Sequence, residues 1–262
     1  MGDFKWRDMY IGYLNLDIRQ DRRDLVEAEF SKAGLTAERT KGKLPHEFDL
    51  TDPKFQVQVN RTPGSIGCWH GQIEIMQKAY QQGKSVMVFE DDIILSSDIQ
   101  NRFDYIQNYI NENDLQFDFF WLGGTIHINP HFWWTGVNPD LPGTENLGRD
   151  AEYIGDKHIF RSYGSFSTHA YWVRYESIPK VIEMLGSVEH LAMGIDWAAI
   201  KLAPQMNNYV FLPGSVIQRD NQSNIGNGMT IFSGFSRLGS HWFSDLVENF
   251  NSDEYNWAET KK

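Results

Sequence analysis

Apolar residues recur at intervals of three and four positions in several stretches of the chain, which is the pattern of a helix with one buried side. The longest such stretch covers residues 65–82 and is followed by Gly83, a residue that commonly ends helices. Its apolar positions are Ile66, Trp69, Ile73, Met76 and Tyr80. The same pattern predicts helices over residues 21–33, 98–111, 177–185 and 196–202.

The helix predicted over residues 21–33 also carries signals at its ends. Asp21 stands at its beginning, where a carboxylate can cap the first turn, and Gly34 stands at its end. Its apolar side is expected to include Leu25, Ala28 and Phe30. This side should pack against a sheet.

Short apolar runs lie between the helices, as is typical of strands that are buried on both faces. They predict strands over residues 9–16, 85–89, 117–122, 170–174 and 209–212. Residues 126–149 have the composition of a loop, and the chain beyond Pro213 is expected to be mostly irregular. Because strands and helices alternate and no linker divides the chain, we expect one α/β domain over residues 1–262. Its sheet should be mainly parallel with helices on both faces.

Composition and charge narrow the classes of protein. With 41% hydrophobic and 14% aromatic residues, the chain has ample material for a core. The formal net charge of -11, from 35 acidic and 24 basic residues, disfavours a nucleic acid partner because phosphates are repelled. There is no secretion signal and no apolar run of about 20 residues, and Cys68 alone cannot form an internal disulfide. We therefore expect a cytoplasmic protein without a transmembrane segment and leave its oligomeric state open.

Three consecutive acidic residues, Glu90, Asp91 and Asp92, follow the strand predicted over residues 85–89. In open α/β sheets, ligands bind beyond the carboxyl ends of the strands. Neighbouring carboxylates there repel one another and lose hydration unless a cation compensates them. Mg²⁺ and Mn²⁺ take oxygen ligands, commonly one or two carboxylates together with substrate phosphates. The acidic run therefore indicates a metal-dependent site, with a solvated acidic turn as the alternative.

Three segments, in this order, resemble glycosyltransferase family 25, which includes lipopolysaccharide-type glycosyltransferases and collagen galactosyltransferases. They read YIGYLNLDIRQDRR at 10–23, GSIGCWHGQIEIMQKA at 64–79 and VMVFEDDIIL at 86–95. The family has an Asn-Leu-Asp-x-x-x-x-Arg-like segment, a Gly-x-x-Gly-Cys-x-x-x-His-like helix start and a strand that ends in Glu-Asp-Asp. The resemblance continues more weakly through residues 170–173 and 194–196. It departs from the family where Trp69, and not Ser, precedes His70, and where Gly71 follows.

The resemblance implies a GT-A fold with a Rossmann-like sheet. Residues 1–124 would form the nucleotide-sugar and metal-binding half, and residues 125–262 the acceptor-binding half. It implies transfer of a hexose, galactose or glucose, from a UDP-sugar to a glycan hydroxyl with inversion. The implied ligands of Mn²⁺ or Mg²⁺ are Asp92 and Glu90, and Glu90 or Asp91 would reach the ribose or a metal-bound water. The implied donor-binding residues are Asn15, Asp17, Arg19, Arg22, His70, Glu90 and Asp91.

Some of these residues have ordinary structural roles as alternatives. Arg22 and Arg23 can instead pair with Asp21 and Asp24 on a solvated helix face, because all four stand in one helical turn. His70 can instead lie at a contact between helix and sheet. Cys68 is expected to pack rather than to act as a nucleophile.

Asp196 is expected to take the proton of the acceptor hydroxyl, because an inverting transfer needs one base and a carboxylate usually supplies it. Its alternative role is to cap the helix that it begins. Trp133 and Trp134, with His127 and His131 beside them, are expected either to stack on an acceptor sugar or to belong to the core.

Two other classes of protein fit parts of the sequence. A metal-dependent nucleotidyltransferase also places carboxylates after a strand, but the chain has no glycine-rich phosphate loop. A non-catalytic carbohydrate-binding protein would use the tryptophans, yet it has little need of three carboxylates at the end of a strand. The sequence singles out no third ligand for the metal, and the candidates are Gln218, Asp220 and His241.

Overall fold

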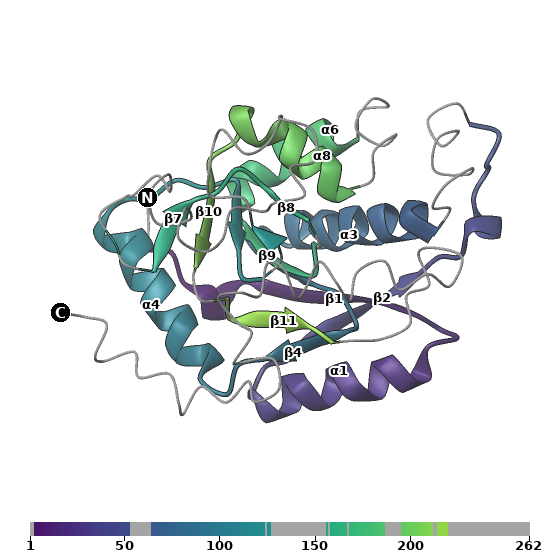
Figure 1. Cartoon of the computed structure of the whole chain (residues 1–262), viewed down its shortest axis with the longest axis horizontal. Coiled ribbons are helices and arrows are strands. Elements are labelled where there is room, and N and C mark those ends of the chain that lie inside the picture. The colour runs from purple at the N-terminus through teal and green to yellow at the C-terminus, as the bar shows by residue number, and fades with distance from the viewer. Residues whose placement is uncertain are drawn as a thin grey trace, which may run out of the picture.

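The computed structural model describes residues 3–52, 64–123, 125–126, 156, 158–166, 168–186, 195–211 and 214–219. Within these residues, a seven-stranded sheet is covered by helices (Figure 1). The strands, in their order across the sheet, are β2 (Glu38–Gly42), β1 (Tyr10–Leu16), β3 (Val86–Phe89), β9 (Ala170–Val173), β5 (Phe119–Trp121), β10 (Asn208–Phe211) and β7 (Ile159–Arg161). The helices are α1 (Gln20–Lys32), α3 (Gly64–Gln81), α4 (Ile99–Glu112), α6 (Ile178–Leu185) and α8 (Ile195–Leu202). The α/β fold expected from the sequence is confirmed.

Five of the seven described strands point in the same direction. β1 is parallel to β2 and β3, and β5 is parallel to β10. β9 lies antiparallel between β3 and β5, so that β3 and β5 share one direction. β9 and the edge strand β7 run the other way. The sheet is therefore mainly parallel, as expected, and the carboxyl ends of β1, β2 and β3 meet at one edge, where ligands bind in such sheets.

Side chains that alternate along the strands separate two hydrophobic cores. In β3, Met87 and Phe89 belong to one core, whereas Val86 and Val88 belong to the other. The first core contains the apolar residues of α1 and α4, and the second contains those of α3, α6 and α8. Figure 1 shows α3, α6 and α8 on one side of the sheet and α1 and α4 on the other. Helices on both faces are thereby confirmed.

Several short strands were not predicted. β4 (Ile93–Leu95) pairs with β11 (Val216–Gln218), and β6 (Thr125–Ile126) pairs with β8 (Ser165–Phe166). The expectation that the chain beyond Pro213 is irregular is wrong for β11, because three residues are too few to show a period. β2 escaped prediction because its sequence, ERTKG, lacks large apolar residues and lies at the sheet edge. β11 reaches the acidic run through Gln218, and β2 contacts Asn15 and Asp17 beside it.

Helix α1 differs from the prediction in its cap and its inner side. Arg19 stands in the cap position without a side-chain cap, and Asp21 lies inside the first turn, where it pairs with Arg19 at 2.7 Å. Leu25 is 41% exposed, so its assignment to the apolar side is wrong. The buried positions, four residues apart, are Arg22, Val26 and Phe30. An arginine occupies one of them because its guanidinium meets the acidic run.

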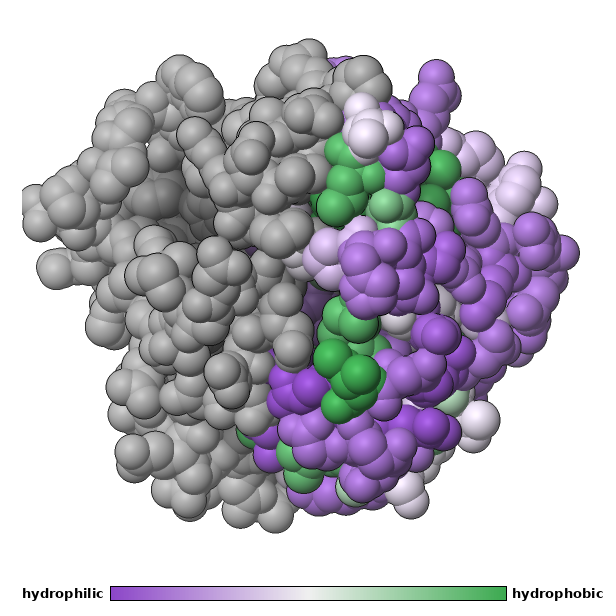
Figure 2. Space-filling model, turned by 90° about the vertical axis from the view of Figure 1, so that its right-hand side faces the viewer, coloured by the Kyte–Doolittle hydropathy of each residue, from purple (hydrophilic) through white to green (hydrophobic). Residues whose placement is uncertain are grey.

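The described surface seen in Figure 2 is mainly hydrophilic, in keeping with the excess of charged residues. The exposed large hydrophobic residues of the described part are Ile18, Leu25 and Tyr80. Tyr80 stacks on Tyr175, with ring centroids 5.1 Å apart. None of the described helices combines the length and the apolar character that crossing a membrane requires.

Candidate active site

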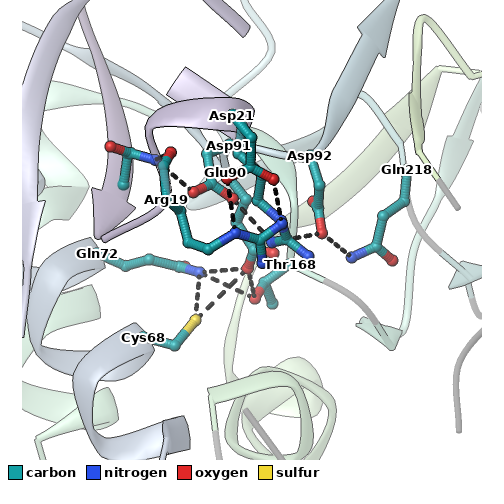
Figure 3. Close-up of polar contacts among 11 residues, drawn as sticks. Arg19, Asp21, Cys68, Gln72, Glu90, Asp91, Asp92, Thr168 and Gln218 are labelled. Carbon is teal, nitrogen blue, oxygen red and sulfur yellow. Dashed lines mark hydrogen bonds and ion pairs between the residues drawn. The ribbon is translucent and has the colours of Figure 1, made fainter. Parts of the chain in front are cut away.

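The three carboxylates after β3 point into three different environments. Because side chains alternate along an extended chain, Glu90 turns to the side of the sheet that carries α3, and Asp91 turns to the side that carries α1. Asp92 lies next to the end of β11 (Figure 3). Each carboxylate therefore has its own set of partners.

Asp91 is held by two buried donors. Asn15, at the end of β1, donates from Nδ2 to Asp91 Oδ2 at 2.7 Å. Arg22 of α1 donates from Nη1 to Asp91 Oδ1 at 2.9 Å. Asn15 is only 1% exposed and also accepts a hydrogen bond from Arg39 through Oδ1. Asn15 and Arg22, both predicted for the donor, are therefore brought to the acidic run, where their described contacts fix Asp91.

Asp92 has one oxygen that is engaged and one that is not. Its Oδ2 lies 3.2 Å from Arg22 Nη1 and accepts a hydrogen bond of 3.2 Å from Gln218 Nε2. Its Oδ1 is buried and has no hydrogen-bond partner among the described residues. Burial raises the pKa of Asp92 to about 6, against the opposing effect of the Arg22 charge. A buried, partnerless carboxylate oxygen is unfavourable unless another group binds it.

Glu90 is held by side chains on the face of the sheet that carries α3. Its Oε1 accepts a hydrogen bond of 3.0 Å from Gln72 Nε2, and the Cys68 thiol and the Thr168 hydroxyl each lie 3.5 Å from the same oxygen. Burial, with the charges of Asp92, Asp196 and Asp91 next, raises the pKa of Glu90 to about 8. Without a compensating cation, Glu90 is therefore mostly protonated at neutral pH.

Two glycines of α3 allow this helix to lie close to the sheet. A Cβ on Gly71 would lie 2.2 Å from Leu14 Cδ1 of β1, and a Cβ on Gly67 would lie 2.2 Å from the carbonyl oxygen of Lys43. The contact at Gly67 is with backbone, so glycine is required there, whereas a Cβ on Gly71 would force the Leu14 side chain to move. The close approach brings Cys68 to Glu90.

Asp196 belongs to α8, which packs on the same face of the sheet as α3, the face to which Glu90 turns. Its charge raises the pKa values of both Glu90 and Cys68, although burial is the larger cause in each case. Helix α8 begins at Ile195, so Asp196 is its second residue, and the alternative role as the cap is wrong. Asp196 is therefore close enough to Glu90 and Cys68 for its charge to act on both.

Basic residues border the site, and two of them were missed. Arg19 pairs with Asp21, and the charges of Asp91 and Asp92 contribute to the raised pKa of Arg19. At the rim, Asp17 pairs with Arg39 and with Lys41, the latter at 2.9 Å. Their position follows from the parallel register of β1 and β2, in which Lys41 faces Asn15. Arg39 and Lys41 stand two positions apart in ERTKG, and this spacing could have indicated a strand with both side chains on one face.

His70 and Gln72 of α3 lie in different environments. His70 lies 3.5 Å from Lys43 Nζ and 3.8 Å from Glu74, and its ring meets Phe48 edge to face. Gln72, two residues further, reaches Glu90 and was missed by the sequence analysis. In an α-helix, positions two apart point to nearly opposite sides, whereas Cys68 and Gln72, four apart, share one side.

The residues present fit a divalent cation. Among the described residues, no group of three or more His, Cys, Asp or Glu side chains is arranged to hold a metal. Mg²⁺ and Mn²⁺ do not need such a group, because they take one or two carboxylates and complete their shell with water and phosphate. Oδ1 of Asp92 has the required chemistry, and the amide of Gln218 lies beside it. Asp220, His241, Trp133 and Trp134 lie outside the described residues.

The raised pKa of Glu90 predicts a pH dependence of stability. Between its ordinary value of 4.5 and about 8, the folded state binds more protons at Glu90 than the unfolded state does, so the free energy of unfolding falls as the pH rises. Glu90→Gln should therefore match the wild type near pH 5 and exceed it in stability near pH 8. His169, whose pKa burial lowers to about 4, acts in the opposite direction below pH 6.5 and is common to both proteins.

Urea unfolding of both proteins in a chelator, from pH 5 to pH 8.5, measures this difference. Free energies of unfolding that change in parallel with pH in the two proteins would contradict the raised pKa of Glu90. A difference between the two free energies of unfolding that grows with rising pH supports the raised pKa.

Comparison with known proteins identifies the family. Residues 9–196 match the model of Glycosyltransferase family 25 (LPS biosynthesis protein). A glycosyltransferase involved in the glycosylation of the major capsid of PBCV-1 is similar at 10% identity and a TM-score of 0.40, over 88% of this chain and 99% of that chain. GlyE of Streptococcus pneumoniae TIGR4 is similar at 11% identity and a TM-score of 0.37, over 91% of this chain and 65% of that chain.

Mouse xyloside xylosyltransferase 1 is similar at 10% identity and a TM-score of 0.36, over 75% of this chain and 82% of that chain. Structural similarity at this level says nothing about substrates. The comparison with curated proteins found no match. The family match covers more than half of the chain and includes the acidic run, the start of α3 and Asp196. The chain therefore belongs to glycosyltransferase family 25 and is a glycosyltransferase.

Proposed function

We propose that this glycosyltransferase moves a hexose, galactose or glucose, from a UDP-sugar to a glycan hydroxyl, with inversion and with Mn²⁺ or Mg²⁺ as cofactor. The single observation that carries the metal dependence is Oδ1 of Asp92, a buried carboxylate oxygen without a hydrogen-bond partner among the described residues. It lies at the carboxyl end of β3, where α/β sheets bind their ligands. The UDP-hexose donor is supported by the family resemblance.

The charges around Asp92 suit a nucleoside diphosphate. A bound cation would act as a Lewis acid for the negative charge that develops on the departing diphosphate. Asp92 would hold this cation through Oδ1, with Gln218 beside it. Arg22, which contacts both Asp91 and Asp92, keeps the two carboxylates in place. Arg19, which pairs with Asp21 and is affected by the charges of Asp91 and Asp92, is the proposed partner of a donor phosphate.

The remaining predicted residues keep proposed roles around this centre. Asp17 at the rim would contact the ribose or the base, and His70 the donor, while Asn15 acts through Asp91. Asp196 would take the proton of the acceptor hydroxyl, because an inverting transfer needs one base and the charge of Asp196 acts on Glu90. Trp133 and Trp134 are the proposed platform for the acceptor sugar.

A thermal-shift panel tests this function against the two other classes of protein. The ligands are UDP, UDP-glucose, UDP-galactose, nucleoside triphosphates and free glycans, each with and without Mn²⁺. We expect UDP and a UDP-hexose to raise the melting temperature only when Mn²⁺ is present, since a ligand that binds the folded state alone stabilises it. Protection by triphosphates but not by UDP-sugars would indicate a nucleotidyltransferase. Protection by free glycans alone would indicate a binding protein.

A further inference from the structure

Gln72 is the most completely engaged buried polar side chain near the acidic run. It is 0% exposed and so has no surface to offer a substrate. Its Nε2 donates to Glu90 Oε1 at 3.0 Å and lies 3.1 Å from Thr168 Oγ1 and 3.3 Å from Cys68 Sγ. Figure 3 shows these side chains converging on the Glu90 carboxyl. An amide buried in this way acts on its neighbours and not on a ligand.

The orientation of the Gln72 amide is set by Tyr171. The Tyr171 hydroxyl donates to Gln72 Oε1 at 2.7 Å, which leaves Nε2 to face Glu90. When Glu90 is ionised, as it is with a cation bound, the reverse orientation would bring Oε1 of Gln72 against Oε1 of Glu90, two acceptors without a hydrogen between them. The Tyr171 ring is itself fixed in β9, since it packs on Phe119 and Trp121 at centroid distances of 5.2 and 5.3 Å. The sheet thus determines which end of the amide points to the site.

The anchoring acts on one oxygen of Glu90 and not on the other. Among the described residues, every hydrogen bond to the Glu90 side chain ends at Oε1. Oε2 is the oxygen that the anchoring leaves for another partner. The negative charges of Asp92, Asp196 and Asp91 all act on Glu90. Glu90 is therefore within electrostatic reach of both Asp92, which is proposed for the cation, and Asp196, which is proposed for the acceptor proton.

We propose that Gln72 is a positioning residue: held by Tyr171, it fixes Oε1 of Glu90 so that Oε2 faces the transferred sugar. This inference rests on the proposed function, because the sugar is the ligand that Glu90 would meet. Gln72 contributes through Glu90 and touches no substrate. Its loss should therefore reduce turnover much more than affinity for UDP, which is assigned to the Asp92 side.

Gln72→Met keeps the length of the side chain and removes its donor. We expect kcat for UDP-hexose to fall by about 10- to 100-fold, the range of one hydrogen bond to an ionisable group. The Kd for UDP with Mn²⁺ should change less than threefold, and the melting temperature by a few degrees at most. Gln77→Met, an exposed position of the same helix, is the matched control and should leave all three quantities unchanged.

Tyr171→Phe provides an independent variant, because it removes only the hydroxyl that orients Gln72. Its kcat should fall less than that of Gln72→Met, and the double variant should resemble Gln72→Met, since the two residues act in one chain of hydrogen bonds. If the kcat losses of the two single variants multiply in the double variant, the two residues do not act through one series of hydrogen bonds. Equal losses in kcat and in affinity for UDP, with a much lower melting temperature, would mean that Gln72 only stabilises the fold.

A crystal structure of Gln72→Met tests the positioning without any substrate. We expect the Glu90 carboxyl to leave its contacts with Thr168 and Cys68 while the backbone of β3 stays in place. A Glu90 side chain that keeps its orientation would overturn the inference. If the wild type turns over no nucleotide-sugar, the proposed function fails, and the crystal structure still decides whether Gln72 positions Glu90.

Discussion

Asp92→Ala will reduce sugar transfer by about 10³-fold or more and leave the melting temperature unchanged or higher. Lewis-acid stabilisation of a leaving group is worth several kcal/mol, and Asp92 carries the oxygen assigned to the cation. Stability should not fall, because folding raises the pKa of Asp92 and its ionised form therefore opposes folding at neutral pH. Transfer with Mn²⁺ supplied, alongside a melting curve in a chelator, measures both effects.

Asp118→Ala is the matched control for a buried carboxylate. Asp118 is 5% exposed and precedes β5, where it accepts hydrogen bonds from Lys180 and from the backbone of Asn207. The Asp118→Ala variant should be less stable than the wild type and keep its turnover per folded molecule, which is the opposite of the result expected for Asp92→Ala. Near-normal turnover in a folded Asp92→Ala protein would remove Asp92 from the metal site.

Asp196→Asn will lower kcat by about 10²- to 10⁴-fold, the usual contribution of a general base, while donor and cation still bind. An amide keeps the size of the carboxylate but cannot take the proton of the acceptor hydroxyl. Steady-state kinetics with each substrate varied in turn, together with titration of UDP in the presence of Mn²⁺, separates the two effects. Asp104→Asn is the control, because Asp104 is a half-buried carboxylate that contacts Arg7 and Trp6.

Two results would reassign Asp196. A loss of kcat below about threefold would show that no proton passes to it. A matching loss of UDP affinity would place it in the donor site instead.

The sequence predicted the parts of the fold that large apolar residues define. The helices at Ile99–Glu112 and Gly64–Gln81 and the strand at Val86–Phe89 were found to within two residues, because each buries a run or a stripe of such residues. β2 and β11 were missed for the opposite reason, since they are short and one of them is polar. These two strands carry Lys41 and Gln218 to the site, so the missed elements are also the ones that complete it.

The candidate site was predictable only as far as it lies in one stretch of sequence. Glu90, Asp91 and Asp92 are adjacent, but their separation onto three sides depends on the pleat of β3 and on which helix covers each face. The structure brings Asn15 and Arg22 to Asp91, which sequence distance does not show.

The start of α3 shows why Gln72 was not predicted for the site. The motif Gly-x-x-Gly-Cys-x-x-x-His, counted from Cys68, ends at residue 72, where this chain has glutamine. The family resemblance pointed to His70, the histidine nearest to that position. Helix geometry favours Gln72, four residues from Cys68 and on the same side of α3, and Gln72 contacts Glu90.

The measurement that tests the central claim most directly is product analysis after incubation of the protein with UDP-galactose or UDP-glucose, Mn²⁺ and a panel of glycans. We predict release of UDP in step with the appearance of one added hexose on an acceptor, and no such product in the chelator or with Asp92→Ala. Formation of pyrophosphate or of a nucleoside monophosphate adduct from a nucleoside triphosphate, without any hexose transfer from the UDP-sugars, would contradict it.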